Sequence, residues 1–326
     1  MNRLQIIFAG CVLVILPIAK ADIDPLQKFR ITVLDVSGNP LEGVPCHAYF
    51  HPNTPDAKGM DTKMETGKTD GSGTVDLSGK TIWYYSSADA ELPGYYTSSV
   101  NDFWTLKRNG DHWEPWPVEV KLVMKKIIRP HPMYAAEHDA VFPDVNKPGP
   151  LGFDLLEMDW VAPVGKGKTA DFVLEGIRQN PEDHSDRPRG WIMLSFPHPG
   201  DGIQRAESSE AGWSELVGPH EAPEAGYLPE WKFQTWENEE DMEAGAVKPQ
   251  KVYVFRVRTV LDKDGKVVSA RYGKMPERMH GKLSFRRSYA GLEYYLNGTD
   301  NDRGLEWDMK TNLFQHLDRA LWLKRP

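Results

Sequence analysis

Hydrophobic and polar positions alternate through the first third of the chain, over residues 29–125. The clearest case is residues 44–50, where every second side chain is apolar, and a period of two places one set of side chains in a core and the other toward solvent. Turn-forming sequences at 37–40 and 69–73 separate such segments, and a last alternating run occupies residues 118–125. Short strands at this spacing predict a two-sheet β-sandwich.

The sequence ITVLDVSGNPLEGVPCHAYF at 31–50, followed by GKTDGSG at 67–73, resembles the carboxypeptidase regulatory-like, or transthyretin-like, group of immunoglobulin-like modules. We assign this resemblance to residues 22–126. It implies an immunoglobulin-like sandwich that serves as an accessory or binding domain without catalytic residues of its own. Because one fold hosts many functions, the resemblance brings no site residues with it.

A proline-rich stretch at 127–150 interrupts the alternation and is interpreted as a linker between two domains. Proline lacks the amide donor that a central strand needs. Strand patterns then recur at 171–174, 191–196, 252–260, 267–272, 282–286 and 293–296. Residues 151–326 are therefore expected to form a second β-sandwich or a jelly-roll-like domain, which makes the chain an all-β protein.

Two segments of the second domain depart from the strand pattern. Residues 207–247 are acidic but contain three tryptophans, which predicts a long ordered excursion, because disordered segments are poor in aromatic residues. Residues 312–323 place apolar side chains at helical spacing. A short C-terminal helix is expected there.

The first 21 residues have the organisation of a cleavable signal peptide. Arg3 gives a positive start, residues 4–18 are largely apolar, and Ala-Lys-Ala at 19–21 supplies a cleavage site. The apolar run is shorter than the ~20 residues of a membrane-spanning helix, so no span is expected after cleavage. Lipidation at Cys11 is the weaker alternative, because the apolar run continues beyond it. The mature chain is expected to begin at Asp22 and to be secreted or periplasmic.

Charge and cysteine content narrow the choice of partners. Removing the signal takes away two of the 39 basic residues and none of the 47 acidic ones, which leaves a net charge near −10. A chain with this acidic excess has no general attraction for nucleic acid or anionic lipid. Cys46 is left without a second cysteine for a disulfide within the chain, and its apolar phase in the alternation predicts a buried thiol.

One polar loop near the C-terminus contains oxygen ligands of the kind that calcium prefers. The candidate ligands are Asp300, Asp302, Glu306 and Asp308. Their spacing lacks the alternating acids and the closing glutamate of an EF-hand, and polar loops of this kind are more often plain turns. No cofactor is expected, with calcium in this loop kept as the alternative.

All eleven tryptophans belong to the mature chain, and Trp104, Trp113 and Trp116 cluster before the last strand of the first domain. Aromatic rings bind sugars by stacking on their apolar faces, although a core or a domain seam is the commoner place for tryptophan. Trp113 and Trp116 flank Glu114 and Pro115 in a segment without alternation. We expect them to point outward as the first ligand contacts, with Trp104 as a third.

The sequence assigns no catalytic residue. It contains no H-E-x-x-H, no paired-cysteine motif and no G-x-S-x-G. Residues 162–169, APVGKGKT, approach a phosphate-binding loop, but the segment that follows has a strand pattern where such a loop needs a helix. We interpret the loop as an exposed basic turn.

The sequence favours an exported, non-enzymatic β-protein that acts as a binding or accessory module of the cell envelope. The favoured partner is a glycan or another envelope component. Two alternatives stay open: a secreted glycan hydrolase that uses carboxylates of the second domain, such as Glu293 with Glu306, and a structural envelope protein without a small ligand.

Overall fold

A computed structural model describes residues 24–53, 61–82, 87–101, 107–180, 182–183, 188–207, 213–235, 251–276 and 280–314. Over these residues the chain is all-β, as the sequence predicted, and contains no helix. It follows that no described helix is long and apolar enough to cross a membrane. The predicted signal peptide lies outside the described residues, and so do residues 315–323 of the predicted C-terminal helix; its first residue, Asn312, ends a strand.

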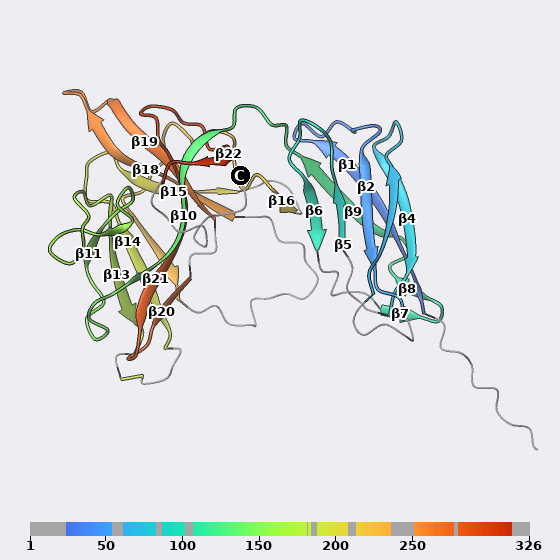
Figure 1. The fold of residues 1–326 in the computed structure, drawn as a ribbon, viewed down its shortest axis with the longest axis horizontal. Coiled ribbons are helices and arrows are strands. Elements are labelled where there is room, and N and C mark those ends of the chain that lie inside the picture. The colour runs from blue at the N-terminus through green and yellow to red at the C-terminus, as the bar shows by residue number, and fades with distance from the viewer. Residues whose placement is uncertain are drawn as a thin grey trace, which may run out of the picture.

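The N-terminal unit is an immunoglobulin-like sandwich of two sheets, on the right in Figure 1, which confirms the predicted fold of this part. The first sheet contains β4 (Thr74–Lys80), β1 (Leu26–Asp35), β8 (His112–Glu114), β7 (Lys107–Asn109) and β9 (Val118–Met124). The second runs β16 (Trp213–Ser214), β6 (Ser98–Asn101), β5 (Ser87–Ala90), β2 (Pro45–Phe50) and β3 (Lys63–Lys68).

The alternation in the sequence explains how these two sheets pack. Cys46 and Phe50 of β2 are fully buried, and so are Phe29 and Ile31 of β1 in the opposite sheet. The alternate residues of β2, Pro45, His47 and Tyr49, face outward and are only partly buried. Burying each large apolar side chain contributes about 1.5–3 kcal/mol to stability.

The second unit, on the left in Figure 1, also has two sheets around one core. The larger contains β15 (Gly202–Glu207), β18 (Lys251–Leu261), β19 (Val267–Pro276), β21 (Ser288–Asn297), β10 (His131–Val141), β22 (Trp307–Asn312) and β20 (His280–Leu283). The smaller runs β12 (Asp159–Trp160), β11 (Leu151–Asp154), β13 (Phe172–Arg178), β14 (Gly190–Ser195) and β17 (Glu230–Gln234).

The interpretation of residues 127–150 as a linker is wrong over β10. This eleven-residue strand pairs with β21 from Met133 to Val141 and lies inside the larger sheet. Its pairing with β22 shifts register between His131 and Met133, so Pro132 occupies an irregular position where its missing amide costs no regular ladder bond.

A segment of the second unit crosses to the first. β16 lies next to β6 in Figure 1 and pairs with it in the N-terminal sandwich. Directly after β16, the carbonyls of Leu216 and Gly218 accept hydrogen bonds from Nζ of Lys125, and the carbonyl of Val217 accepts one from Nζ of Lys274. Both lysines are buried. The two units therefore share one buried polar seam.

Cys46 provides a test of the N-terminal core. Its side chain is fully buried, and burial, with a smaller contribution from Asp89, raises the pKa of its thiol to about 12. Since the thiolate is the reactive form, we expect a thiol reagent to label Cys46 at pH 8 only after the sandwich opens. Mass spectrometry measures the rate of labelling. A native protein that is labelled as fast as the protein in denaturant would contradict this packing.

Candidate functional site

One residue of the sequence-predicted aromatic site, Trp116, lines an open depression at the end of the N-terminal sandwich. Its lining residues are Lys107, His112, Glu114, Pro115 and Trp116, around a volume of about 660 Å³. The Trp116 side chain is 43% exposed, and its ring meets the His112 ring edge-on at 5.4 Å. Glu114 is held in place by a 2.6 Å hydrogen bond that Nδ2 of Asn109 donates to its carboxylate.

The expectation that Trp113 also points outward is wrong. Trp113 is only 9% exposed and belongs to the core of the sandwich. Its indole Nε1 donates a 3.0 Å hydrogen bond to the carbonyl of Thr81. β8 alternates its side chains, so residues 113 and 114 face opposite sides of the strand. Trp104 lies outside the described residues, and its predicted role stays a prediction.

The structure does not bring the four candidate calcium ligands together. The Asp300 carboxylate accepts a hydrogen bond from the Arg271 side chain. The Asp302 carboxylate accepts hydrogen bonds from the Arg129 side chain and from the backbone amide of Gly304. The Asp308 carboxylate accepts hydrogen bonds from the backbone amides of residues 310 and 311, which follow it directly in the chain.

Glu306, the fourth predicted ligand, belongs to the seam between the units. Its carboxylate is buried and accepts 2.9 Å and 3.0 Å hydrogen bonds from the Tyr96 hydroxyl and the Ile128 amide. The Arg129 amide donates to it as well, at 3.3 Å. These donors make Glu306 a structural acceptor where the chain leaves the first unit.

Buried carboxylates of the second unit converge on one arginine. Arg258 lies on β18 at a register shift with a positive φ of 55°, a conformation that costs a non-glycine residue about 1–3 kcal/mol. Its guanidinium pairs with Asp171 at 2.7 Å and with Asp154 at 2.9 Å. Burial raises the pKa of Asp171 even though Arg258 opposes the shift. The arrangement joins the two sheets of this unit, and both carboxylates are occupied by their ion pairs with Arg258.

The basic turn at 162–169 is built around the same acids. The amides of Lys168 and Thr169 donate to Asp154, and the amide of Lys166 donates to Asp159. Burial opposes ionisation of Asp154, but these amide bonds outweigh it and hold its pKa below the ordinary value. Amides that would surround a phosphate are therefore occupied by the chain's own carboxylates.

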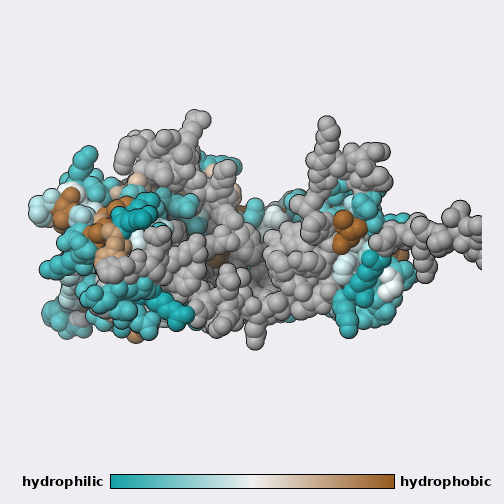
Figure 2. All heavy atoms as spheres, turned by 90° about the horizontal axis from the view of Figure 1, so that it is seen from below, coloured by the Kyte–Doolittle hydropathy of each residue, from teal (hydrophilic) through white to brown (hydrophobic). Residues whose placement is uncertain are grey.

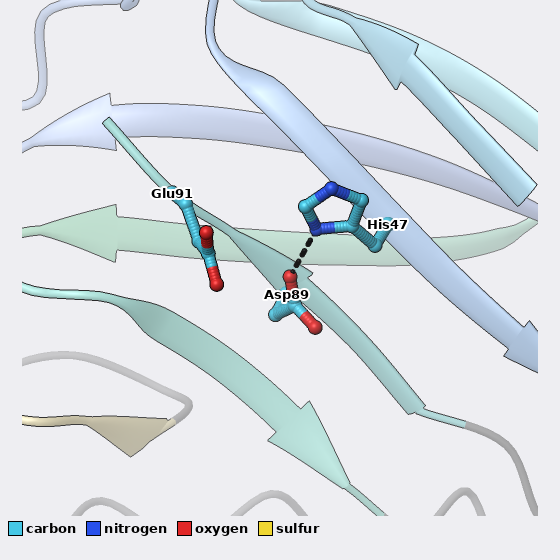
Figure 3. A group of neighbouring side chains, drawn as sticks. All are labelled: His47, Asp89 and Glu91. Carbon is cyan, nitrogen blue, oxygen red and sulfur yellow. Dashed lines mark hydrogen bonds and ion pairs between the residues drawn. The ribbon is translucent and has the colours of Figure 1, made fainter. Parts of the chain in front are cut away.

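Sequence reasoning missed a group of potential metal ligands on the outer face of the N-terminal sandwich. His47 of β2 lies opposite Asp89 of β5, and Glu91 follows two residues later on the same side (Figure 3). Nδ1 of His47 is 2.6 Å from Oδ1 of Asp89. The alternation in residues 44–50 already placed His47 outward, but the strand opposite it could not be identified from the sequence.

Replacing Arg258 tests the structural role of the buried acids. Arg258→Met keeps a non-glycine residue at the strained position but leaves Asp171 and Asp154 without their cation, so we expect a loss of about 3–5 kcal/mol in stability. The control Arg287→Met removes an exposed pair with Asp139 and should cost about 1 kcal/mol or less. Urea denaturation measures both, and equal losses would contradict the assignment.

Comparisons with known proteins assign no family. No family model and no curated protein matches the chain. Matching solved structures include a 3-chlorocatechol 1,2-dioxygenase from Rhodococcus opacus 1CP, with 13% identity and a TM-score of 0.25. The match covers 34% of this chain and 64% of the dioxygenase chain, just under two thirds of its length. The shaft pilin SpaA from Lactobacillus rhamnosus GG matches with 16% identity and a TM-score of 0.20, over 58% of this chain and 92% of the pilin. The major pilin SpaD from Corynebacterium diphtheriae matches with 9% identity and a TM-score of 0.23, over 83% and 65%. Similarities this weak carry no argument about function, which has to rest on the residues themselves.

Proposed function

We propose that this chain is an exported accessory module of the cell envelope that binds glycans at the depression beside Trp116. The observation that carries the proposal is the partly exposed indole of Trp116, which lies among the hydrogen-bonding side chains of Lys107, His112 and Glu114. An aromatic face with polar groups at its edge suits a sugar ring, whose faces are apolar and whose rim carries hydroxyl groups.

The construction of the depression supports a preformed site. Pro115 and Pro117 fix backbone angles on both sides of Trp116. His112 packs against the indole, and Asn109 anchors Glu114. Side chains held in this way lose little conformational entropy when a ligand arrives.

The surface also favours a polar ligand. On the face drawn in Figure 2, brown hydrophobic residues form narrow areas bordered by hydrophilic ones, over both units. The exposed large hydrophobic residues among those described are spread over many elements. The described residues on this face therefore give no support to an apolar docking partner.

The first unit is proposed, on its sequence, to belong to the carboxypeptidase regulatory-like modules, which suits an accessory role. The hydrolase alternative has less support, because Glu306, one of the second-domain carboxylates that it would use, is a buried acceptor of the Tyr96 hydroxyl and two backbone amides. A structural envelope protein remains the second candidate, favoured by the shared buried seam between the units.

Substitution of Trp116 tests the proposal. Each stacked ring contributes about 0.5–1.5 kcal/mol beyond area burial, so Trp116→Ala should weaken glycan binding about tenfold once lost contact area is included. Because Trp116 is exposed, stability should change by less than about 0.5 kcal/mol. An array of envelope polysaccharides and a thermal melt provide the two readouts.

Two variants control this experiment. Met309→Ala removes a comparably exposed apolar side chain, 44% exposed, from the second unit and should leave binding unchanged. Trp113→Ala removes a core residue and should cost about 3–5 kcal/mol of stability. Unchanged binding in Trp116→Ala would place any ligand elsewhere, and a wild-type protein that retains no glycan would favour the structural candidate.

A further inference from the structure

We propose that His47, Asp89 and Glu91 form a binding site for a divalent first-row transition ion such as Zn²⁺. The three side chains each offer one ligand atom, and these atoms lie within 4.8 Å of one another (Figure 3). One imidazole nitrogen with two carboxylate oxygens is a donor set that suits Zn²⁺ or Mn²⁺ better than the all-oxygen sets of Ca²⁺.

The site is carried by a regular sheet. His47 and Asp89 are direct partners in the antiparallel pairing of β2 with β5. The Glu91 amide donates a 3.1 Å hydrogen bond to the carbonyl of Pro45, which fixes the backbone where β5 ends. Ligands on paired strands hold their positions better than ligands on loops, so the framework is rigid before an ion arrives.

Only short side-chain movements separate this arrangement from coordination. Metal bonds of about 2.0–2.2 Å in a tetrahedral site place neighbouring ligand atoms about 3.4 Å apart. The His47 and Asp89 atoms, now 2.6 Å apart, have to separate slightly, whereas the exposed Glu91 carboxylate has to approach. An ion that binds Nδ1 of His47 and Oδ1 of Asp89 would replace the hydrogen atom between them, which passes to solvent as a proton, and take both atoms as ligands.

The electrostatic surroundings favour a cation. Among the described residues, no lysine or arginine forms an ion pair with Asp89 or Glu91, and the contact of Asp89 is with the His47 ring. Their side chains are partly shielded, with 20% of His47 and 15% of Asp89 exposed. Two neighbouring carboxylates that no lysine or arginine of the described chain neutralises provide a negative potential that favours a divalent ion.

Tyr49 acts as a positioning residue for this site. It follows His47 on the same face of β2, and its hydroxyl forms a hydrogen bond with Asp89. A donor to a ligating carboxylate fixes its orientation. Three protein ligands leave room for water or a ligand oxygen on the solvent side.

Titration of tag-free full-length protein with Co²⁺ tests the proposal, because the visible spectrum of Co²⁺ reports its ligands and Zn²⁺ competes for the same site. We expect one ion per chain, bound at least tenfold more weakly by His47→Gln, Asp89→Asn and Glu91→Gln. His198→Ala, which removes an exposed histidine near Asp201, should bind like the wild type.

The outcome is independent of glycan binding, because Trp116→Ala should keep its metal affinity. Circular dichroism confirms that each variant is folded, and the Glu91→Gln change lies at an exposed position where folding is not at risk. Absence of Co²⁺ binding at millimolar concentration, or binding that His47→Gln and Glu91→Gln leave unchanged, would overturn the site.

Discussion

The structure depends on the buried polar seam where two lysine side chains hold the carbonyls of residues 216–218. A buried amino group without partners costs several kcal/mol, so each lysine requires these carbonyls in place. Lys125 directly follows β9 of the first unit, and Lys274 belongs to β19 of the second. Burial and the neighbouring Lys125 lower the pKa of Lys274 to about 7, which reflects how strongly the seam excludes water. The segment they hold therefore belongs to both units.

This seam explains other features of the molecule. β16 completes the second sheet of the first unit because residues 216–218 are anchored next to it. Where the chain passes between the units, the Glu306 carboxylate accepts hydrogen bonds from the Tyr96 hydroxyl and from two backbone amides. These hydrogen bonds fix the start of β10. The depression at Trp116 and the face that carries His47 both belong to the N-terminal unit. The second unit is joined through the seam to the unit that carries both proposed sites.

Local patterns predicted the strands but not their partners. Alternation at 44–50 identified β2, since half-buried strands have a period of two. A strand pattern at 252–260 identified β18. β10 was missed because its alanines and charged residues obscure the alternation, and because Pro132 falls at an irregular pairing. Trp113 was placed outward because nothing in the sequence shows that three residues around it form a strand. The His47–Asp89 contact joins residues 42 apart and depends on strand register, which only the assembled sheet defines.

Differential scanning calorimetry of the full chain tests the shared seam most directly. If the seam joins the two units, the wild type should unfold in one transition whose calorimetric and van't Hoff enthalpies agree. The double variant Lys125→Met/Lys274→Met should separate it into two transitions. Two transitions in the wild type, or an enthalpy ratio near two, would contradict the claim that the units fold as one body.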